Sequence, residues 1–403
     1  MEKSKNKSNF CIRPFNSLDL TADGRMRVCC HIDTKLSKFS QKKDYNIKET
    51  NVKDWWRSDY LQYIRSSLLE NEKLNECSYC HKQEGRGFES LRQQSNYEHK
   101  AIFNNDFSNK LELIGKDNLA HPEDVTVSIT NLCNLKCQMC SGTSSSKLLI
   151  ENNALGFEQH RQKDYDINDA QYNDIKEIAH HDLRYLRLLG GEPLFNPKVI
   201  DLLNLVVENG KAKNIILHIT TNGTVCNEKI MDLLRKFKHV RMMFSVDGTE
   251  GCNEYIRYPS SWENVKNNIK TFTTLPGAYF CINTTLQNLN ILYVDQLIEF
   301  AFQNNIFIQL KEVKHHKNLE ITNLPKSVLS KALSKLSTID KSKLTHTSNV
   351  ESLISFLRNY LEKNEKLDPD NFDSFLSMVD KRDNYRKISI KDYMPELAEE
   401  IYQ

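Results

Sequence analysis

The spacing of apolar residues changes repeatedly between residues 120 and 315. Short apolar or alternating runs, which are typical of strands, are followed by longer stretches with apolar residues three or four positions apart, which are typical of helices. We expect strands at residues 124–130, 183–189, 215–221, 240–246, 278–286 and 307–313. Strands that alternate with helices usually pair in parallel. The pattern therefore predicts an α/β fold, built as a partial (β/α)6 barrel that is open on one side.

Helical spacing is clearest after the second of these strands and near the C-terminus. Residues 197–208 have apolar residues at helical spacing, namely Val199, Ile200, Leu202, Leu203, Leu205 and Val206. We also expect helices at residues 228–237, from Trp262 onward, at 328–336 and at 350–361. The segment 320–403 contains no cysteine. We expect it to be a helical extension that closes the open side of the barrel or holds a partner.

The first 100 residues have a different organisation. An Asp23-Gly24 turn separates two short strand-like runs at residues 17–21 and 25–30, which predicts a hairpin. Apolar residues at helical spacing predict one helix over residues 52–69. We therefore expect a small cysteine-rich α+β module before the barrel.

Length, charge and cysteine content limit the classes of function. The 403 residues suffice for a barrel-sized domain and a smaller companion. Lys and Arg number 55 and Asp and Glu 53, so the net charge of +2 indicates neither a nucleic acid nor a membrane as partner. No apolar run approaches the ~20 residues that span a bilayer, and the N-terminus lacks the apolar core of a secretory signal. Eleven cysteines then indicate metal ligation in a reducing cytoplasm.

Three cysteines follow the first predicted barrel strand. They are Cys133, Cys137 and Cys140, in the spacing C-x3-C-x2-C. This position is the C-terminal end of a strand, where α/β barrels place their chemistry. A structural zinc ion or an ordinary [4Fe–4S] cluster takes four protein ligands. The triad therefore needs a distant fourth ligand, or it leaves one iron open to a substrate or cofactor.

Five cysteines of the N-terminal module form a second candidate site. They are Cys11, Cys29, Cys30, Cys77 and Cys80. The hairpin can bring the separate cysteines to the C-x-x-C pair, so a site with four ligands is the simplest interpretation, and zinc is an alternative to iron–sulfur. Adjacent strand residues point to opposite faces, so one of Cys29 and Cys30 ligates; we choose Cys29, with Cys30 as the alternative. His81 and Glu84 are expected in a solvated loop.

Three further predicted strands end in short polar motifs. Residues 190–193 read Gly-Gly-Glu-Pro, residues 220–223 Thr-Thr-Asn-Gly, and residues 245–248 Ser-Val-Asp-Gly. Adjacent glycines let a backbone approach a ligand closely. Ser245 and Asp247 are two residues apart and point to the same face. Since barrel strands end at a common rim, we expect these motifs beside the triad.

Together, the triad and these motifs resemble the radical SAM superfamily. In that family three cysteines hold a [4Fe–4S] cluster and S-adenosylmethionine chelates the fourth iron, which accounts for the missing ligand. The resemblance implies that Cys133, Cys137 and Cys140 hold this cluster in a TIM-like barrel. It implies these contacts with the cofactor: Gly190, Gly191, Glu192, Pro193, Asn222, Ser245, Asp247 and Arg257. A turn role for Asn222 and pairing of Arg257 with surface carboxylates are the alternatives.

The N-terminal cysteines resemble the auxiliary-cluster modules called SPASM and twitch. Those modules normally follow the radical SAM barrel, whereas this one precedes it. Its five cysteines are fewer than the seven of a SPASM pair of clusters. The resemblance implies one auxiliary [4Fe–4S] cluster, with Cys11, Cys29, Cys77 and Cys80 as ligands. We thus expect an auxiliary module at residues 1–100, a barrel at 120–315 and a helical extension at 320–403.

The resemblance also implies an activity. A radical SAM enzyme takes an electron from a donor such as flavodoxin or ferredoxin, cleaves S-adenosylmethionine reductively, and abstracts a substrate hydrogen with the 5′-deoxyadenosyl radical. The auxiliary cluster would accept or relay an electron in a net oxidation such as crosslinking or dehydrogenation. Relatives with such modules often modify peptides, so a peptide or protein is the expected substrate.

Other functions stay open from the sequence. A redox-neutral epimerase would need a hydrogen donor, for which Cys281 on the fifth strand is the candidate, although core packing is the ordinary role of an isolated cysteine. A carbohydrate or another small molecule is an alternative substrate. A zinc-stabilised binding protein would explain the cysteines, but it would not need the polar motifs at the strand ends.

Overall fold

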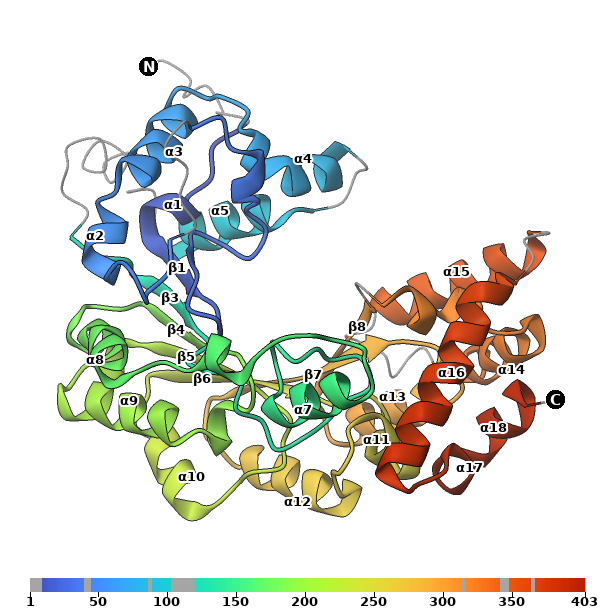
Figure 1. Cartoon of the computed structure of the whole chain (residues 1–403). Helices are drawn as coiled ribbons and strands as arrows, with labels where there is room; N and C mark the ends of the chain where they lie inside the picture. The colour runs from blue at the N-terminus through green and yellow to red at the C-terminus, as the bar shows by residue number, and fades with distance from the viewer. Residues whose placement is uncertain are drawn as a thin grey trace. The chain divides into compact units, whose positions relative to one another are not determined.

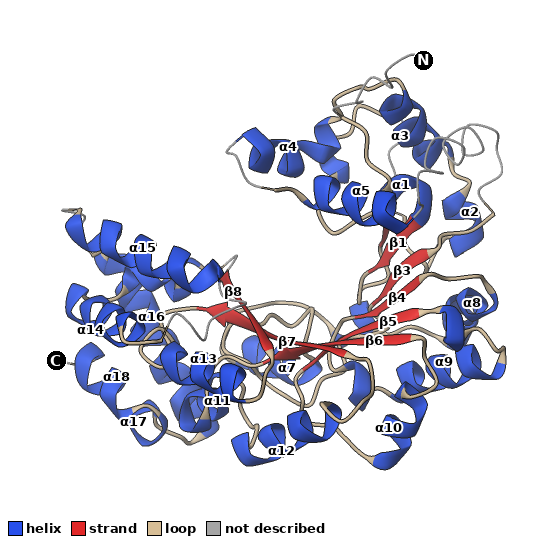
Figure 2. Ribbon diagram, turned by 180° about the vertical axis from the view of Figure 1, so that it is seen from behind, coloured by secondary structure: helices blue, strands red, loops and turns tan. Residues whose placement is uncertain are grey.

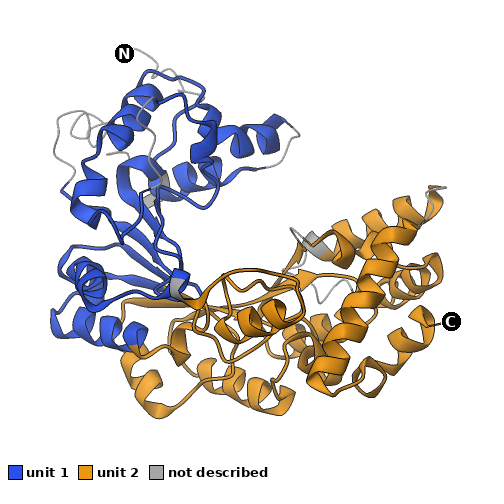
Figure 3. Ribbon diagram, in the orientation of Figure 1, with its two compact units in different colours: residues 1–130, 163–190, 198–217 blue, residues 131–162, 191–197, 218–403 orange. Residues whose placement is uncertain are grey.

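The computed structural model describes residues 9–39, 45–85, 89–102, 120–313, 316–340, 348–363 and 367–402. The chain divides into two compact units (Figure 3). Unit 1 comprises residues 1–130, 163–190 and 198–217, and unit 2 comprises residues 131–162, 191–197 and 218–403. No helix within the described ranges is both long enough and apolar enough to cross a bilayer.

The described residues form one eight-stranded sheet, in the order β2-β1-β3-β4-β5-β6-β7-β8 (Figure 1). The strands are β1 (Ser17–Leu20), β2 (Met26–Arg27), β3 (Asp124–Val127), β4 (Tyr185–Leu188), β5 (Ile216–Thr221), β6 (His239–Ser245), β7 (Tyr279–Leu286) and β8 (Phe307–Glu312). Strands β3 to β8 coincide with the six predicted barrel strands, and the pairs β3–β4, β6–β7 and β7–β8 are parallel. The predicted α/β fold with a partial barrel is confirmed.

The predicted N-terminal hairpin is present and extends the barrel sheet. Strand β1 pairs antiparallel with β2 and parallel with β3, where Ser17 lies opposite Asp124. In the turn, Gly24 has a φ of +87° and its N–H donates to the Thr21 carbonyl at 2.8 Å. Strand β2 ends at Arg27, so Cys29 follows the strand and is not part of it, contrary to the prediction. The pairing of β1 with β3 joins distant segments, and such a pairing leaves no local pattern in the sequence.

Unit 1 contains the helices α1 (Arg13–Asn16), α2 (Val52–Trp56), α3 (Asp59–Leu69), α4 (Ser78–Gly85), α5 (Leu91–Ile102), α8 (Asp169–Glu177) and most of α9 (Pro197–Glu208). The single helix predicted over residues 52–69 is two helices, because Ser58 caps α3 by accepting a hydrogen bond from the Leu61 N–H. The inner face of α3, including Ile64 and Leu68, packs against the segment that contains Cys11. This helix therefore supports a candidate ligand.

Unit 2 contains α7 (Ser146–Ala154), α10 (Glu228–Leu234), α11 (Glu250–Ile256), α12 (Trp262–Phe272), α13 (Val294–Gln303), α14 (Lys326–Ser337), α15 (Ser348–Glu362), α16 (Pro369–Arg386), α17 (Ile390–Tyr393) and α18 (Pro395–Ile401). Helices α10 and α12 lie on the same side of the unit 2 strands (Figure 2). The predicted helical extension is confirmed as α14 to α18. Its longest helix, α16, begins with Asp368 as N-cap and Pro369 in the first turn, both favourable helix-start residues.

Candidate functional site

The three cysteines of the triad lie together in the loop between β3 and α7. Cys133 and Cys137 are buried, and they form an apolar cluster with Leu135, against which Cys140 packs. A hydrogen bond with the Cys140 thiol lowers the pKa of Cys137 to about 7, although burial opposes this effect. Burial raises the pKa of Cys133 to about 12. The loop thus gathers three thiols in a partly water-excluded place, where thiolates need positive charge beside them.

The two glycines after β4 let the triad loop pass close to the chain. A Cβ on Gly191 would lie 2.0 Å from the carbonyl oxygen of Leu132, the residue before Cys133. The next N–H, of Glu192, donates to that same carbonyl at 2.8 Å. Gly190 has a φ of +106°, which side chains disfavour. The Gly-Gly pair therefore fixes the position of the triad loop.

Glu192 is buried, and other residues of the chain donate hydrogen bonds to its carboxylate. It accepts hydrogen bonds from the Leu194 N–H at 3.0 Å, the Thr221 hydroxyl at 2.8 Å and the Asn222 N–H at 2.6 Å. Burial raises its pKa to about 7, against the lowering effect of these bonds. Pro193 follows in a buried turn. Glu192 thus ties the segment after β4 to the end of β5.

Asn222 connects the turn after β5 to the triad loop. Its Nδ2 donates to Oδ1 of Asn134, the residue after Cys133, at 2.9 Å, and Asn134 in turn donates to the Thr224 hydroxyl at 2.7 Å. The side chain therefore has a positioning role in this structure. Ser245 is half-buried at the end of β6, where it lies opposite Asn283 of β7.

Asp247 and Arg257 form a buried ion pair beside the triad. Arg257 Nε lies 2.8 Å from Asp247 Oδ2, and Asp247 Oδ1 accepts from the Thr285 N–H at 2.7 Å. Arg257 Nη1 also lies 3.8 Å from the sulfur of Cys137. Arg257 therefore faces the triad, and its partner is a buried carboxylate and not a surface one.

Cys281 does not lie beside the triad or the Asp247–Arg257 pair. It is the third residue of β7 and is 1% exposed, and its backbone lies opposite Phe307 at the start of β8. The residue of β7 that contacts the site is Thr285. Thr285 is four positions further along the strand than Cys281, which corresponds to about 13 Å.

The N-terminal cysteines form a second group of thiols. Burial and the neighbouring thiols of Cys11, Cys29 and Cys80 all raise the pKa of Cys77. Burial raises the pKa of Cys29 to about 12, and Cys11 is among its neighbours. Cys30 is exposed, and the charges near it are Asp19, Arg13 and Arg27. Cys77 thus lies within electrostatic range of Cys11, Cys29 and Cys80.

Helix α5 holds the segment around Cys11. Arg92 Nη1 and Asn96 Nδ2 donate to the Phe10 carbonyl at 2.9 and 2.8 Å, and Asn96 Oδ1 accepts from the Ile12 N–H at 2.9 Å. Arg92 also pairs with Glu84 of α4 at 2.5 Å. Glu84 and His81 therefore lie in a helix next to the C-x-x-C pair, and the expected solvated loop is wrong.

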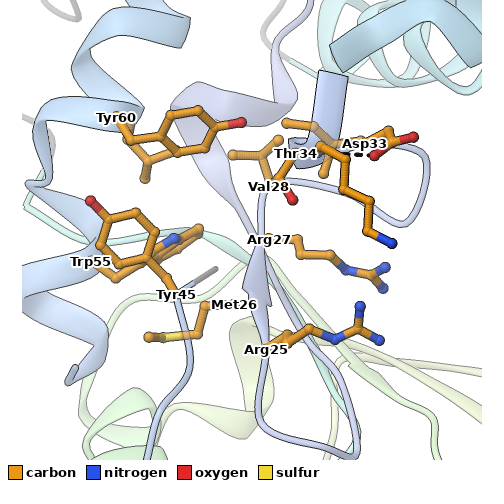
Figure 4. Close-up of a pocket in the computed structure, with 12 residues that line it drawn as sticks. Arg25, Met26, Arg27, Val28, Asp33, Thr34, Tyr45, Trp55 and Tyr60 are labelled. Carbon is orange, nitrogen blue, oxygen red and sulfur yellow. Dashed lines mark hydrogen bonds between the residues drawn. The ribbon is translucent and has the colours of Figure 1, made fainter. Parts of the chain in front are cut away.

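His31 belongs to none of the sequence motifs described above, yet its Nδ1 lies 3.9 Å from the sulfur of Cys80. A cavity of about 90 Å³ lies beside the strand that leads to Cys29. Tyr45, Trp55 and Tyr60 lie on one side of this strand, and Arg25 and Arg27 lie on the other (Figure 4). Each arginine is paired, with Asp23 and Asp19 respectively.

Two arginines of α16 that the sequence analysis also missed, Arg382 and Arg386, bind the triad loop through its backbone. Their i, i+4 spacing places them on one face of a helix, and the Asp368-Pro369 start signal was present in the sequence. Within the described ranges, no group of three or more His, Cys, Asp or Glu is arranged to hold a single metal ion.

Two known protein families match separate regions of this chain. Residues 127–301 match the Radical SAM superfamily, and residues 11–81 match the SPASM iron–sulfur cluster-binding domain. The GTP 3',8-cyclase of Clostridium perfringens is 26% identical over 225 residues, which are 51% of this chain and 63% of the relative. The radical SAM cyclopropyl synthase TigE of Paramaledivibacter caminithermalis is 24% identical over 264 residues, or 61% of this chain and 54% of the relative.

Among solved structures, Streptococcus suis SuiB bound to the precursor peptide SuiA is 16% identical, with a TM-score of 0.39; the match covers 67% of this chain and 61% of SuiB. The chain spans about half to two thirds of the length of the curated relatives it matches. The two family matches cover the segments that contain the triad, the strand-end motifs and the N-terminal cysteines. Residues 127–301 therefore match the Radical SAM superfamily, and the match to the SPASM iron–sulfur cluster-binding domain precedes them in the chain.

Proposed function

We propose that Cys133, Cys137 and Cys140 hold the [4Fe–4S] cluster that binds S-adenosylmethionine. The observation that carries this proposal is the set of three gathered thiols, packed beside a glycine that leaves no room for a Cβ and facing a buried guanidinium. When bound, the cluster and S-adenosylmethionine supply a radical that takes a hydrogen atom from carbon. The residues of the chain position the thiols, exclude water and place the Arg257 charge beside Cys137.

The contacts of Glu192 and Asn222 refine their proposed roles. Both side chains are held by other residues of the chain, so we assign them to positioning the cofactor site and not to direct contact through the Glu192 carboxylate. Gly190, Gly191 and Pro193 shape the same turn. Ser245, Asp247 and Arg257 line the ends of β6 and the segment after α11, and we propose them as the cofactor-facing group.

We propose Cys11, Cys29, Cys77 and Cys80 as ligands of an auxiliary [4Fe–4S] cluster. Four thiols suit a fully protein-ligated cluster, and such a cluster serves to accept or relay electrons. This supports a net oxidation such as crosslinking or dehydrogenation. The position of Cys281, far along β7 from the triad side, offers no support for an epimerase.

A peptide or protein is the substrate class we propose. A cavity of about 250 Å³ opens at the C-terminal ends of β7 and β8 in unit 2. It is lined by Leu286, Val313, Ile321 and Phe356, with Glu312 and Glu320 at its polar side. Mixed apolar and acidic lining suits a side chain with an aliphatic stem and a cationic end. The reductant would be a flavodoxin or ferredoxin.

The test of the cluster assignment is iron and sulfide content after anaerobic reconstitution. We expect about eight irons per chain in the wild type. A Cys133/Cys137/Cys140→Ala variant should keep about half, and S-adenosylmethionine should change the electron paramagnetic resonance spectrum of the wild type alone. Zinc without iron would overturn the proposal.

The test of the substrate class is formation of 5′-deoxyadenosine with dithionite as reductant, measured with peptide pools and with nucleotides and sugars. Loss of two hydrogens from a peptide would support the oxidation. A peptide whose mass is unchanged after reaction in ordinary water, but which incorporates deuterium when the reaction runs in heavy water, would indicate epimerisation. Turnover of a nucleotide or sugar alone would overturn the peptide assignment.

A further inference from the structure

Helix α16 reaches from the C-terminal extension to the backbone between the triad cysteines. Arg382 Nη1 donates to the carbonyl and to the side-chain oxygen of Gln138, both at 2.7 Å. Arg386 Nη2 donates to the Lys136 carbonyl at 2.7 Å. Cys137 lies between these two acceptors. The two arginines therefore hold the residues on either side of one cysteine.

Helix α7, which follows the loop in the chain, supplies a counter-charge. Glu151 accepts from Arg386 Nε at 3.0 Å and from Nη2 at 2.6 Å, and it pairs with Lys136 Nζ at 2.8 Å. Asn152 accepts from Arg382 Nη2 at 3.3 Å. Although burial opposes it, the bonds and charges of Arg386 and Lys136 lower the pKa of Glu151, so this carboxylate stays ionised at neutral pH.

The other side of the loop is bound to the segment that carries Arg257. The N–H groups of Lys136 and Gln138 donate to the carbonyls of Tyr258 and Ile256 at 2.6 and 2.8 Å. Helix α16 holds this segment as well, because Asp383 accepts from the Tyr255 hydroxyl at 2.8 Å. The triad loop and the Arg257 segment are thus fixed by neighbouring residues of one helix.

Cations outnumber carboxylates in this network. Three cations, Lys136, Arg382 and Arg386, lie near Glu151, and Asp383 is a second carboxylate near Arg386. Burial lowers the pKa of Arg382 to about 10, so the guanidinium remains charged at neutral pH. Buried charge without a full set of counter-charges is costly. The excess is offset when an anionic group, such as thiolates bound to an iron–sulfur cluster, lies beside the network.

We propose that Arg382 and Arg386 are positioning residues that hold the Cys133–Cys140 loop in its ligating form and supply positive charge to the cluster. This inference rests on the proposed cluster ligation. It assigns the C-terminal extension a role at the cofactor site, through α16.

The test begins with the protein before reconstitution, where no cluster contributes. Amide hydrogen exchange is followed on peptides from residues 131–145, with peptides from α14 as reference. Arg386→Ala and Arg382→Gln should accelerate exchange of the triad loop at least about tenfold, because each removes charge-assisted bonds. Arg358→Ala is the matched control, since Arg358 is an exposed arginine of α15. It should leave both regions unchanged.

Measurements on reconstituted protein distinguish the two parts of the proposed role, which are positioning of the loop and supply of positive charge. Arg382→Gln should lower the midpoint potential of the S-adenosylmethionine-responsive cluster, because it removes a buried cation. Arg386→Lys keeps the charge and should loosen the loop with little change in potential; it also serves if the alanine variant fails to fold. The inference would be overturned if Arg386→Ala and Arg382→Gln left the exchange of the triad loop unaltered and the midpoint potential stayed at its wild-type value. Accelerated loop exchange in the variants, together with a wild type that binds no iron after reconstitution, would instead overturn the proposed cluster ligation.

Discussion

Arg257 and Asp247 form an ion pair in which both side chains are buried and the guanidinium faces Cys137. Asp247 is fully buried, so removal of its charge would leave a buried cation without a partner. We expect Asp247→Asn to lower the free energy of unfolding of the cluster-free protein by about 3–5 kcal/mol. Urea unfolding measures this change.

Asp232→Asn is the control for that experiment. Asp232 also pairs with an arginine, Arg235, but on the exposed surface of α10. Water and salt screen such a pair, so the control should unfold almost as the wild type does. An equal, small effect of both variants would show that Asp247 is dispensable for holding Arg257.

Gly191 makes the closest backbone approach in the site. Its added Cβ would meet the Leu132 carbonyl at 2.0 Å, and backbone atoms cannot turn aside as a flexible side chain can. We expect Gly191→Ala to destabilise the cluster-free protein by ~3 kcal/mol and to reduce iron content to about half after reconstitution. Gly85→Ala is the control, because nothing lies within 4 Å of the Cβ it would add. Full iron content in Gly191→Ala would refute this account of the glycine.

Glu192 should make stability depend on pH. Its folded-state pKa of about 7 lies above its ordinary value of 4.5, so the folded state binds more protons than the unfolded state between these values. Stability attributable to Glu192 is therefore present at low pH and decreases as pH rises from about 4.5 to 7, by on the order of 3 kcal/mol. The difference in unfolding free energy between wild type and Glu192→Gln, measured from pH 4 to 8, should show this fall. A constant difference would contradict it.

The strands and helices of the barrel could be predicted because each has its own characteristic spacing of apolar residues. The strands from β3 to β8 and the helix over residues 197–208 depend on local spacing, and the triad on three nearby cysteines. Contacts between distant segments could not be predicted in the same way. Nothing near Ser17 specifies its pairing with Asp124, and nothing near Arg386 specifies Glu151 as its partner, since such contacts follow from how the folded elements pack.

The same contrast between local sequence patterns and contacts that depend on packing holds for single residues of the site. Sequence motifs correctly indicated that Glu192 and Asp247 lie near the triad, because both follow strand ends. The partners of their carboxylates are backbone N–H groups, the Thr221 hydroxyl and a buried arginine, and these depend on packing. The break in the predicted helix over residues 52–69 is different, because Ser58 is a recognisable N-cap and a signal for it was present.

The choice between Cys29 and Cys30 can be settled by substitution. Cys29 is half-buried and is an electrostatic neighbour of Cys11 and Cys77, whereas Cys30 is exposed near Arg13 and Arg27. A cluster ligand must lie with the other thiols, and its loss leaves three ligands where the protein supplied four. We therefore expect Cys29→Ala to lose about half of the iron after reconstitution and Cys30→Ala to keep it all. The electron paramagnetic resonance signal that responds to S-adenosylmethionine should persist in both variants, because it belongs to the triad. Iron loss in Cys30→Ala alone would mean that the segment after β2 turns the other way when the cluster binds, and the neighbouring cysteine would then be the ligand.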